Sequence, residues 1–296
     1  MLRSGRGDVA ELTASMLRAW PLPMPVDGDK HDRGTVLVIG GSPETPGAAL
    51  LAGVAAMRAG AGRLQLLTCA SAADGMALAV PEALVSGLAT TATGGLDLPR
   101  AEDRVGALAA GADAVVIGPG LVDPEAIAAL LAMVFAGVRT DTVVVIDAQA
   151  IGCFSGLDQE VGEPRARLVL TPNHGEASAY VSEVDEPAVP GSHAATVAAM
   201  SGAVVTMHGD VATSDGRRWT GGPGSLGLGT SGSGDVLAGL IGGLGARCRE
   251  SAQAACWGTY LHGAAGERLA RRIGPIGYLA RELADEAPCV LAELAP

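Results

Sequence analysis

The sequence has 296 residues, which is enough for one large α/β domain with a substantial core. Its formal net charge of −12 argues against nucleic acid or an anionic membrane as the main partner. The single lysine, Lys30, lies in the segment GDKHD and not in a Gly-Lys-Ser/Thr motif after a strand, which excludes a Walker-type phosphate loop.

The cysteines and the N-terminus indicate the compartment. Five cysteines are scattered along the chain and never form a CxxC pair, so we expect reduced thiols and neither a disulfide framework nor a zinc site. No signal peptide is visible. The longest run of small apolar residues, 46–57, is shorter than the roughly 20 residues that a membrane span requires. The sequence therefore predicts a soluble, cytoplasmic protein.

The first expected element is a helix over residues 8–20, where apolar residues follow helical spacing and Asp8 is suited to the N-cap. Residues 21–34 are rich in Pro and Gly, which is typical of a linker. We therefore predict two parts. Residues 1–29 form an N-terminal helix and linker, and residues 30–296 form the main domain.

Six short apolar runs rich in β-branched residues predict strands that are buried on both faces: 35–41, 63–68, 113–120, 142–148, 167–173 and 203–209. The Ala/Leu-rich segment 47–60 predicts a helix, and helical stretches separate most of the other strands. This alternation predicts a three-layer αβα sandwich with a mainly parallel central sheet. Ligands bind such sheets beyond the carboxyl ends of the strands. The segments GGS, GPG, DA, TPN and HGD, which follow strands, should therefore converge on one edge.

The last third of the chain predicts a hairpin and three helices. Asp215-Gly216 lies between short β-prone pieces within residues 210–220, which is a hairpin signal. A glycine-rich loop from residue 227 runs into an apolar helix, residues 251–272 predict another, and residues 277–286 predict a third that ends before Pro288. No internal repeat or second domain is evident.

The most informative segment is Thr230–Gly239, TSGSGDVLAG. Successive backbone N–H groups in such a loop can face one anion, and the dipole of the following helix adds partial positive charge. Asp235 lies in the first helical turn, where a carboxylate beside a transferring phosphoryl group can accept the proton of an attacking hydroxyl. The glycine pattern alone fits equally well a helix start that Asp235 caps.

The motif GSGDVLAGL resembles the anion-hole motif of ribokinase-like enzymes, in whose kinases the aspartate is the catalytic base. Further segments are similar, in order and spacing, to ADP/ATP-dependent NAD(P)H-hydrate dehydratases: GTVLVIGGSPETPGAALLAGVAAMRAGAGRLQLLT, VVIGPGL, VVIDA, VLTPNHGE and YLHGAAGERLA. The resemblance spans about residues 30–290 and implies a ribokinase-like fold. A shared fold alone does not fix a function.

The resemblance also implies roles for individual residues. The hydrated-cofactor site is matched by Ala48 in PGA, Gly120 in GPG, Asn173 and Asp235. Asp235 also matches the catalytic base. The nucleotide site is matched by His208, Gly209, Asp210, Val211, Ala212, Gly232, Ser233 and Gly234. No residue is assigned to direct metal coordination.

Two positions depart from the pattern of this family. The family reads Thr-Pro-His-Pro-Gly-Glu where this chain reads TPNHGE, so Asn173 stands at the usual histidine position and His174 follows it. Asparagine can still donate a hydrogen bond, but it does not titrate. The nucleotide loop usually begins Lys-Gly, and here it begins His208-Gly209. Either His208 or an arginine replaces the lysine, or nucleotide binding is weakened.

Four other residues are polar candidates, and for three of them two interpretations are open. Asp147 could help to organise magnesium through water or cap a turn, and the turn is slightly favoured. Glu176 could contact water-bound magnesium or start a helix. His262 lies in an apolar helix, which favours a core histidine over a catalyst. His193 lies in a Pro/Gly/Ser segment that indicates no specific role.

The resemblance implies a two-step repair reaction. ATP or ADP would phosphorylate the ring hydroxyl of NADHX or NADPHX, the hydrates of the reduced nicotinamide cofactors, and loss of phosphate would regenerate NADH or NADPH. Phosphate leaves more readily than hydroxide, and the anion hole would stabilise negative charge in both steps. Mg²⁺ would neutralise the nucleotide phosphates. Two alternatives stay open: a small-molecule kinase of the same fold acting on a vitamin precursor, and a non-catalytic nucleotide-binding relative.

The expected partners are therefore small molecules, namely NAD(P)HX and an adenine nucleotide, with no nucleic acid and no membrane. The resemblance implies a homo-oligomer. A functional partnership with a separate NAD(P)HX epimerase is also expected. The segment before the linker is much shorter than a domain, which usually has roughly 50 residues or more.

Overall fold

The computed structural model of the protein describes residues 9–24, 29–99, 101–156, 167–181 and 192–294. Asp8, the residue suited to an N-cap, lies outside these residues. The strands form one sheet and are β1 (Val9–Glu11), β2 (Thr35–Ile39), β3 (Arg63–Cys69), β4 (Ala83–Leu88), β5 (Ala114–Ile117), β6 (Val143–Ile146), β7 (Leu168–Leu170), β8 (Val204–Met207), β9 (Asp210–Ala212) and β10 (Arg218–Thr220).

The helices alternate with most of these strands. They are α1 (Ala14–Ala19), α2 (Pro46–Arg58), α3 (Ala70–Ala79), α4 (Glu102–Ala110), α5 (Pro124–Gly137), α6 (Gln149–Gly156), α7 (His174–Val181), α8 (His193–Ser201), the 3₁₀ helix η2 (Leu226–Gly229), α9 (Ser233–Cys248), α10 (Ser251–Arg272) and α11 (Ala280–Leu294).

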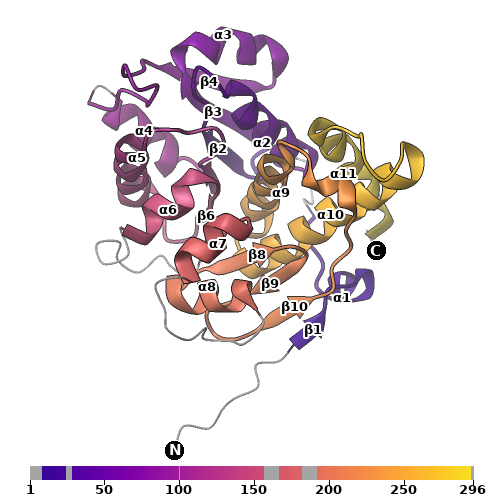
Figure 1. Ribbon diagram of the computed structural model, residues 1–296. Helices are drawn as coiled ribbons and strands as arrows, with labels where there is room; N and C mark the ends of the chain where they lie inside the picture. The colour runs from indigo at the N-terminus through magenta and orange to yellow at the C-terminus, as the bar shows by residue number, and fades with distance from the viewer. Residues whose placement is uncertain (1–8, 25–28, 100, 157–166, 182–191, 295–296) are drawn as a thin grey trace, which may run out of the picture.

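The sheet separates two hydrophobic cores, as the alternation of side chains along β2 shows. Val36 and Val38 pack with α2, α9, α10 and α11, whereas Leu37 and Ile39 pack with α4 to α8 on the opposite face. Figure 1 shows the two sets of helices on the two sides of the strands. The predicted three-layer αβα sandwich with a mainly parallel sheet is therefore confirmed.

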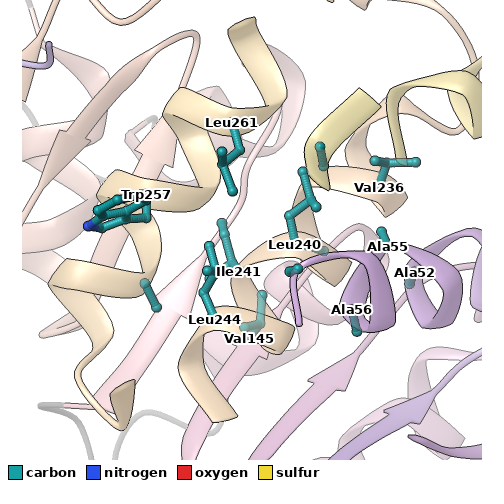
Figure 2. Close-up of a cluster of buried hydrophobic side chains, with 14 of the residues drawn as sticks. Ala52, Ala55, Ala56, Val145, Val236, Leu240, Ile241, Leu244, Trp257 and Leu261 are labelled. Atoms are coloured by element: carbon teal, nitrogen blue, oxygen red, sulfur yellow. The ribbon is translucent and has the colours of Figure 1, made fainter. Parts of the chain in front are cut away.

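Close packing of α2 against α9 positions the start of α9. A side chain at Gly239 would place its Cβ 2.1 Å from the carbonyl oxygen of Ala52, and one at Gly243 would place its Cβ 2.3 Å from that of Ala56. Figure 2 shows Ala52, Ala55 and Ala56 of α2 lying against the apolar residues of α9. Because the glycines let the two backbones meet, the glycine-rich start of α9 lies beside the start of α2.

The order of the strands contains a switch point. The sheet runs β1-β10-β9-β8-β7-β6-β5-β2-β3-β4, with parallel pairing from β8 through to β4. The chain builds outward from β2 to β4 and then resumes with β5 on the other side of β2. In open α/β sheets, ligands bind beyond the carboxyl ends of the strands at such a point. The candidate site is therefore expected between the loops that follow β2 and β5.

The N-terminal helix is shorter than the sequence predicts. Val9–Glu11 forms β1, which pairs in parallel with β10, and the helix begins only after Thr13, whose hydroxyl accepts a hydrogen bond from the amide of Met16 at 3.3 Å. Leu12 and Leu17 are buried in the same core as α9 and α10. Pairing with an edge strand overrides the weak local preference for helix. The division of the chain after residue 29 stays a prediction.

The end of the chain gives a second correction. The last helix, α11, continues through Pro288 to Leu294, although the sequence predicts an end before this proline. Proline removes one intrahelical hydrogen bond, but buried residues on both sides of it, including Ala284, Ala287 and Val290, hold the helix against α2 and α10. The predicted hairpin is confirmed as β9 and β10, which pair antiparallel. Among the described helices, none has the length and hydropathy to cross a bilayer.

Candidate active site

The loops that follow β8, β7, β6, β5 and β2 lie along one edge of the sheet in that order. These strands are neighbours and parallel, so their carboxyl ends point the same way. The predicted convergence of GGS, GPG, DA, TPN and HGD is therefore confirmed.

At the switch point, the loops after β2 and β5 are joined through their backbones. The amide of Gly41 donates to the carbonyl of Pro119 at 2.7 Å, and the Thr45 hydroxyl donates to the carbonyl of Gly120 at 3.0 Å. Gly120 has φ +71°, and a Cβ there would lie 2.4 Å from the Thr45 carbonyl oxygen and 3.0 Å from the Cβ of Ala48. The structure thus brings Ala48 and Gly120 together, although they are far apart in the sequence.

The glycine-rich start of α9 lies beside this point. Gly232 is the N-cap residue, with φ +87°, and a Cβ there would lie 2.6 Å from a methyl group of Leu51 on α2. Because Gly232 has no side chain, the cap supplies no acceptor for the N–H groups of the first turn. Those of Gly234 and Asp235 belong to this turn, where the helix dipole favours an anion. The first turn therefore has the backbone geometry that an anion hole requires, and its role as one stays a prediction.

Two carboxyl groups near the start of α9 have strongly raised pKa values. Burial raises the pKa of Asp235 to about 6. Asp147, after β6, is 5% exposed, and burial raises its pKa to about 7. The Thr171 hydroxyl, which donates to Asp147 at 2.6 Å, opposes this shift. The carboxylates of Asp235 and Glu176 add to it, which indicates that the three acidic groups lie near one another.

Asn173 and Glu176 form the start of α7. The Asn173 side-chain oxygen accepts from the amide of Glu176 at 3.0 Å, and its amide nitrogen donates to the Glu176 carboxylate at 2.8 Å. The Glu176 carboxylate also accepts from the backbone amide of Asn173 at 2.9 Å. These reciprocal bonds form a capping box. Both interpretations of Glu176 therefore have support, since it starts a helix and lies close to Asp147.

The nucleotide segment that begins at His208 is a tight turn. His208 and Gly209 join β8 to β9, and both have positive φ, +50° and +84°. This is the backbone of a two-residue hairpin turn. Asp210 accepts from the amide of Gly221 at 3.4 Å. The side chains of Val211 and Ala212 are buried in the two cores, so only their backbone can face a ligand.

Three histidines meet beside this turn, and we call His174, His193 and His208 the histidine corner. The ring centroid of His174 lies 4.9 Å from that of His208 and 5.5 Å from that of His193. All three residues are exposed. The two departures from the family pattern are thus neighbours in space: His174 follows Asn173, and His208 stands where lysine is usual. The sequence indicated no role for His193, and only the fold brings it here.

Ser233 and His262 form a buried pair behind the anion hole. The Ser233 hydroxyl and the Nε2 atom of His262 share a hydrogen bond of 2.9 Å. Burial lowers the pKa of His262 to about 4, so the imidazole is neutral near pH 7. His262 is therefore a core histidine with a partner, as its apolar helix favoured. The Ser233 hydroxyl is engaged by this bond, and its backbone amide donates to the carbonyl of Thr230 at 3.2 Å, so both polar groups of Ser233 that could bind an anion already have partners.

A family model described as NAD(P)H-hydrate dehydratase matches residues 36–289, most of the chain. The chain belongs to the NAD(P)H-hydrate dehydratase family. It is 45% identical over 292 residues to the ADP-dependent (S)-NAD(P)H-hydrate dehydratase of Xanthomonas campestris, with 97% of each chain covered. Other relatives are named bifunctional NAD(P)H-hydrate repair enzymes, and the chain spans 51% to 56% of their length.

Solved structures agree on the fold. A ribokinase-like superfamily protein from Enterococcus faecalis aligns with a TM-score of 0.83 at 24% identity, covering 100% of this chain and 98% of that one. The ADP/ATP-dependent NAD(P)H-hydrate dehydratase of Bacillus subtilis, co-crystallised with ATP and Mg²⁺, aligns with a TM-score of 0.77 at 26% identity, covering 97% and 99%. The ribokinase-like fold of the family is therefore confirmed for this chain.

The acidic groups of the site suit magnesium held through nucleotide and water. Within the described residues, no group of three or more His, Cys, Asp or Glu side chains is arranged to hold a metal by itself. Mg²⁺ commonly keeps several waters and binds through one or two carboxylates together with substrate phosphates. Asp147 and Glu176 lie at the edge where the anion hole would place those phosphates, so the donor set fits such an ion.

Proposed function

We propose that this protein dehydrates the S form of NADHX and NADPHX back to NADH and NADPH, with ADP or ATP as the phosphoryl donor. One observation carries the proposal. Asp235, with its raised pKa, lies in the first turn of α9, at the edge of the sheet where Ala48 and Gly120 meet. The names of the Xanthomonas and Bacillus relatives support this substrate and the use of nucleotide.

Asp235 has the properties of a general base in this reaction. With a pKa of about 6, it is mostly ionised at neutral pH and yet basic enough to accept a proton. It would take the proton of the ring hydroxyl as that oxygen attacks the terminal phosphorus of the nucleotide. In the second step, the phosphorylated ring carbon loses phosphate, the neighbouring carbon loses a proton, and the ring double bond re-forms.

The start of α9 would stabilise the phosphoryl group in both steps. The backbone amides of Gly232 and Gly234 precede and open the helix, where N–H groups and the dipole attract negative charge, whereas the amide of Ser233 already donates to the carbonyl of Thr230 at 3.2 Å. Such donors are already oriented before the reaction, so they cost no reorganisation as charge develops. Mg²⁺, bound to the nucleotide and held near Asp147 and Glu176, would neutralise charge on the transferring group.

The histidine corner would contact the nucleotide in place of the missing lysine. His208 is exposed at the turn that matches the family's nucleotide loop, and the ring of His174 lies against it. Imidazoles can carry a positive charge near neutral pH and can stack against a base. Gly209 and Asp210 would contribute through the same turn, and Val211 and Ala212 through their backbone. Asn173 would position α7 at the site and offer its exposed face to the substrate.

In the experiment, purified NADHX is incubated with the protein and Mg²⁺, and the recovery of the absorbance of reduced nicotinamide is measured. ADP and ATP are compared, and ADP is tested first because the Xanthomonas relative is named for it. Recovery that needs nucleotide supports the proposal. A stable phosphorylated product without NADH would show a kinase, and nucleotide binding without any turnover would show a non-catalytic relative.

The setting of this activity follows from the same proposal. Free cysteines, Cys69, Cys153, Cys248, Cys256 and Cys289, suit a reducing compartment, and we propose the cytoplasm. The bifunctional relatives are about twice as long, and we propose an NAD(P)HX epimerase as the functional partner that would supply the S form. A homo-oligomer remains part of the proposal, and its measurement by light scattering would test it.

A further inference from the structure

A second concave site lies at the amino edge of the sheet, away from the candidate active site. It is a cavity of about 420 Å³ between the N-terminal segment, the end of α9 and the end of α11. Arg247, which lines it, stands near the C-terminus of α9, whereas Asp235 stands in the first turn of the same helix. The helix rise puts about 18 Å between these two residues. The cavity is therefore separate from the anion hole.

The walls of the cavity are mostly apolar. Leu22 and Leu294 are buried, Leu291 is half-buried, and the ring of Trp257 closes one side. The indole nitrogen of Trp257 donates to the carbonyl of Trp20 at 2.9 Å, so the ring is held in place. The volume falls within the range of roughly 300–1,000 Å³ that is typical of small-ligand pockets.

Three arginines, Arg18, Arg33 and Arg247, line this apolar space, and no carboxylate is among the lining residues that the structure describes. Within the described part of the chain, neither Arg33 nor Arg247 forms an ion pair, although the protein has 32 acidic residues and a net charge of −12. Arg247 is held by backbone, since its guanidinium donates to the carbonyls of Ala59 at 2.9 Å and Pro23 at 3.1 Å. The Nε atom of Arg33 is buried and has no hydrogen-bond partner.

The charges of these two arginines act on each other. Burial lowers the pKa of Arg247, and the positive charge of Arg33 shifts it in the same direction. A buried N–H group without a partner and two like charges near each other both destabilise the empty cavity. An anionic group bound in the cavity beside the two guanidinium groups would relieve the repulsion between their charges. Guanidinium groups bind carboxylate and phosphate in this way through two parallel hydrogen bonds.

We propose that this cavity binds an amphipathic anion, with its acidic head between Arg33 and Arg247 and its apolar chain along Leu22, Leu294 and Trp257. Apolar walls with a few polar groups at one end are the usual construction of such a site. This binding does not depend on the dehydratase reaction, because the cavity and the anion hole share no residue.

The probe is decanoate, kept below the concentration at which it forms micelles, with tryptophan fluorescence and titration calorimetry as readouts. Trp257 lines the cavity, so its emission should change on binding. Decanoate should bind at least tenfold more tightly than decanol, which has the same chain and no charge, and acetate should not bind. Each methylene between octanoate and decanoate should strengthen binding by up to about fourfold. Decyl phosphate shows whether a phosphate head binds better than a carboxylate.

The decisive variant is Arg33→Gln. Among the described residues, the Arg33 Nε atom has no hydrogen-bond partner, so the melting temperature of this variant should stay the same or rise. The affinity of this variant for decanoate should then lie within threefold of its affinity for decanol. The matched control is Arg104→Gln, which removes one charge from α4 on the opposite face of the sheet and should leave decanoate binding unchanged.

Three results would overturn the proposal. The first is equal binding of decanoate and decanol by the unchanged protein, and the second is undiminished decanoate binding by Arg33→Gln. The third is a calorimetric signal that appears only under conditions in which sedimentation shows an oligomer to dissociate. This result would show that a second copy of the chain covers the cavity.

Discussion

The two halves of the sheet's carboxyl edge are built by different means. At the switch point, backbone meets backbone: a Cβ at Gly120 would lie 2.4 Å from the Thr45 carbonyl oxygen, and one at Gly239 would lie 2.1 Å from that of Ala52. At the histidine corner, exposed imidazole rings lie 4.9 and 5.5 Å apart on the surface. Packing restricts which residue types fit at the switch point, which we call the packed half. At the histidine corner, the exposed half, a different side chain would disturb the fold little.

This difference explains where the chain departs from the family pattern. Asn173 and His208, the two departures, both lie in the exposed half. A substitution there alters one contact with a ligand and little of the fold. A substitution in the packed half would force two helices or two loops apart, and the motifs there match the family throughout. Packing therefore restricts the residues whose backbone would bind the ligand. A residue that acts through an exposed side chain can be replaced by another residue type.

The largest effect is expected for Asp235→Asn in the packed half. Asparagine keeps the shape of the side chain but cannot accept the proton of the ring hydroxyl. Loss of a general base typically lowers the rate by about 10²–10⁴-fold, so kcat should fall by this factor while KM for both substrates changes less than about threefold. Steady-state kinetics with NADHX measure this, and Asp103→Asn, in the exposed first turn of α4, is the control. Unchanged turnover in Asp235→Asn would refute the assigned role.

The pH dependence of the unchanged enzyme gives the next largest effect. The pKa of Asp235 is raised to about 6, and only the ionised carboxylate accepts a proton. The rate should therefore fall about tenfold for each pH unit below 6 and be level above it. The profile of kcat/KM for NADHX from about pH 4.5 to about pH 8.5 tests this, because kcat/KM reports the pKa values of the free enzyme. A break near pH 4 would mean that the carboxyl is not desolvated during turnover.

Gly120→Ala tests whether packing alone holds the switch point. The alanine would need φ near +71° and would press its Cβ against the Thr45 carbonyl oxygen. A residue held in such a conformation costs about 1–3 kcal/mol. We expect a lower melting temperature together with a higher KM for NADHX. Gly75→Ala, in α3 where a Cβ would meet nothing within 4 Å, is the matched control; it should leave KM unchanged and raise the melting temperature slightly, because alanine favours a helix interior.

Asp147→Asn tests the buried acid between the two halves. The folded-state pKa of about 7 lies above the ordinary value, so the carboxylate destabilises the fold as pH rises from about 4 through 7. Asparagine keeps an acceptor for the Thr171 hydroxyl and removes that charge. Without nucleotide or Mg²⁺, the variant should melt a few degrees higher than the parent at pH 8, by about 2–4 °C per kcal/mol. The difference should shrink towards pH 5.

The packed half could be predicted largely from the sequence, because its signals are local. Short β-branched runs gave the parallel strands, and the glycines that follow them marked the carboxyl edge. Failures occurred where tertiary contacts outweigh local preference. Val9–Glu11 pairs with β10 instead of starting a helix, and α11 continues through Pro288. The edge strand β4 carries a mixed exposed and half-buried pattern, which gave no clear signal.

The histidine corner could not be predicted, for a different reason. His174, His193 and His208 come from α7, α8 and the turn after β8, and no local pattern relates them. Asp147 shows the same limit, since a carboxylate that ends a strand looks like a turn cap until burial and neighbouring acids are known. The family resemblance placed Asp235 correctly at the start of α9. Its raised pKa and its proximity to Asp147 required the fold.

The smallest effect is expected for exchanges in the histidine corner. His208→Lys restores the residue that is usual in the family and places an ammonium group where the imidazole stands. An exposed contact of this kind is worth up to about 1 kcal/mol, so KM for ADP should fall up to about fivefold at pH 8, and His208→Ala should raise it by a similar factor. His193→Ala, at the far ring of the corner, is the control and should shift KM less. If the lysine variant binds ADP no better and the alanine variant binds it equally well, then the exposed half takes no part in nucleotide binding, and an arginine elsewhere replaces the lysine.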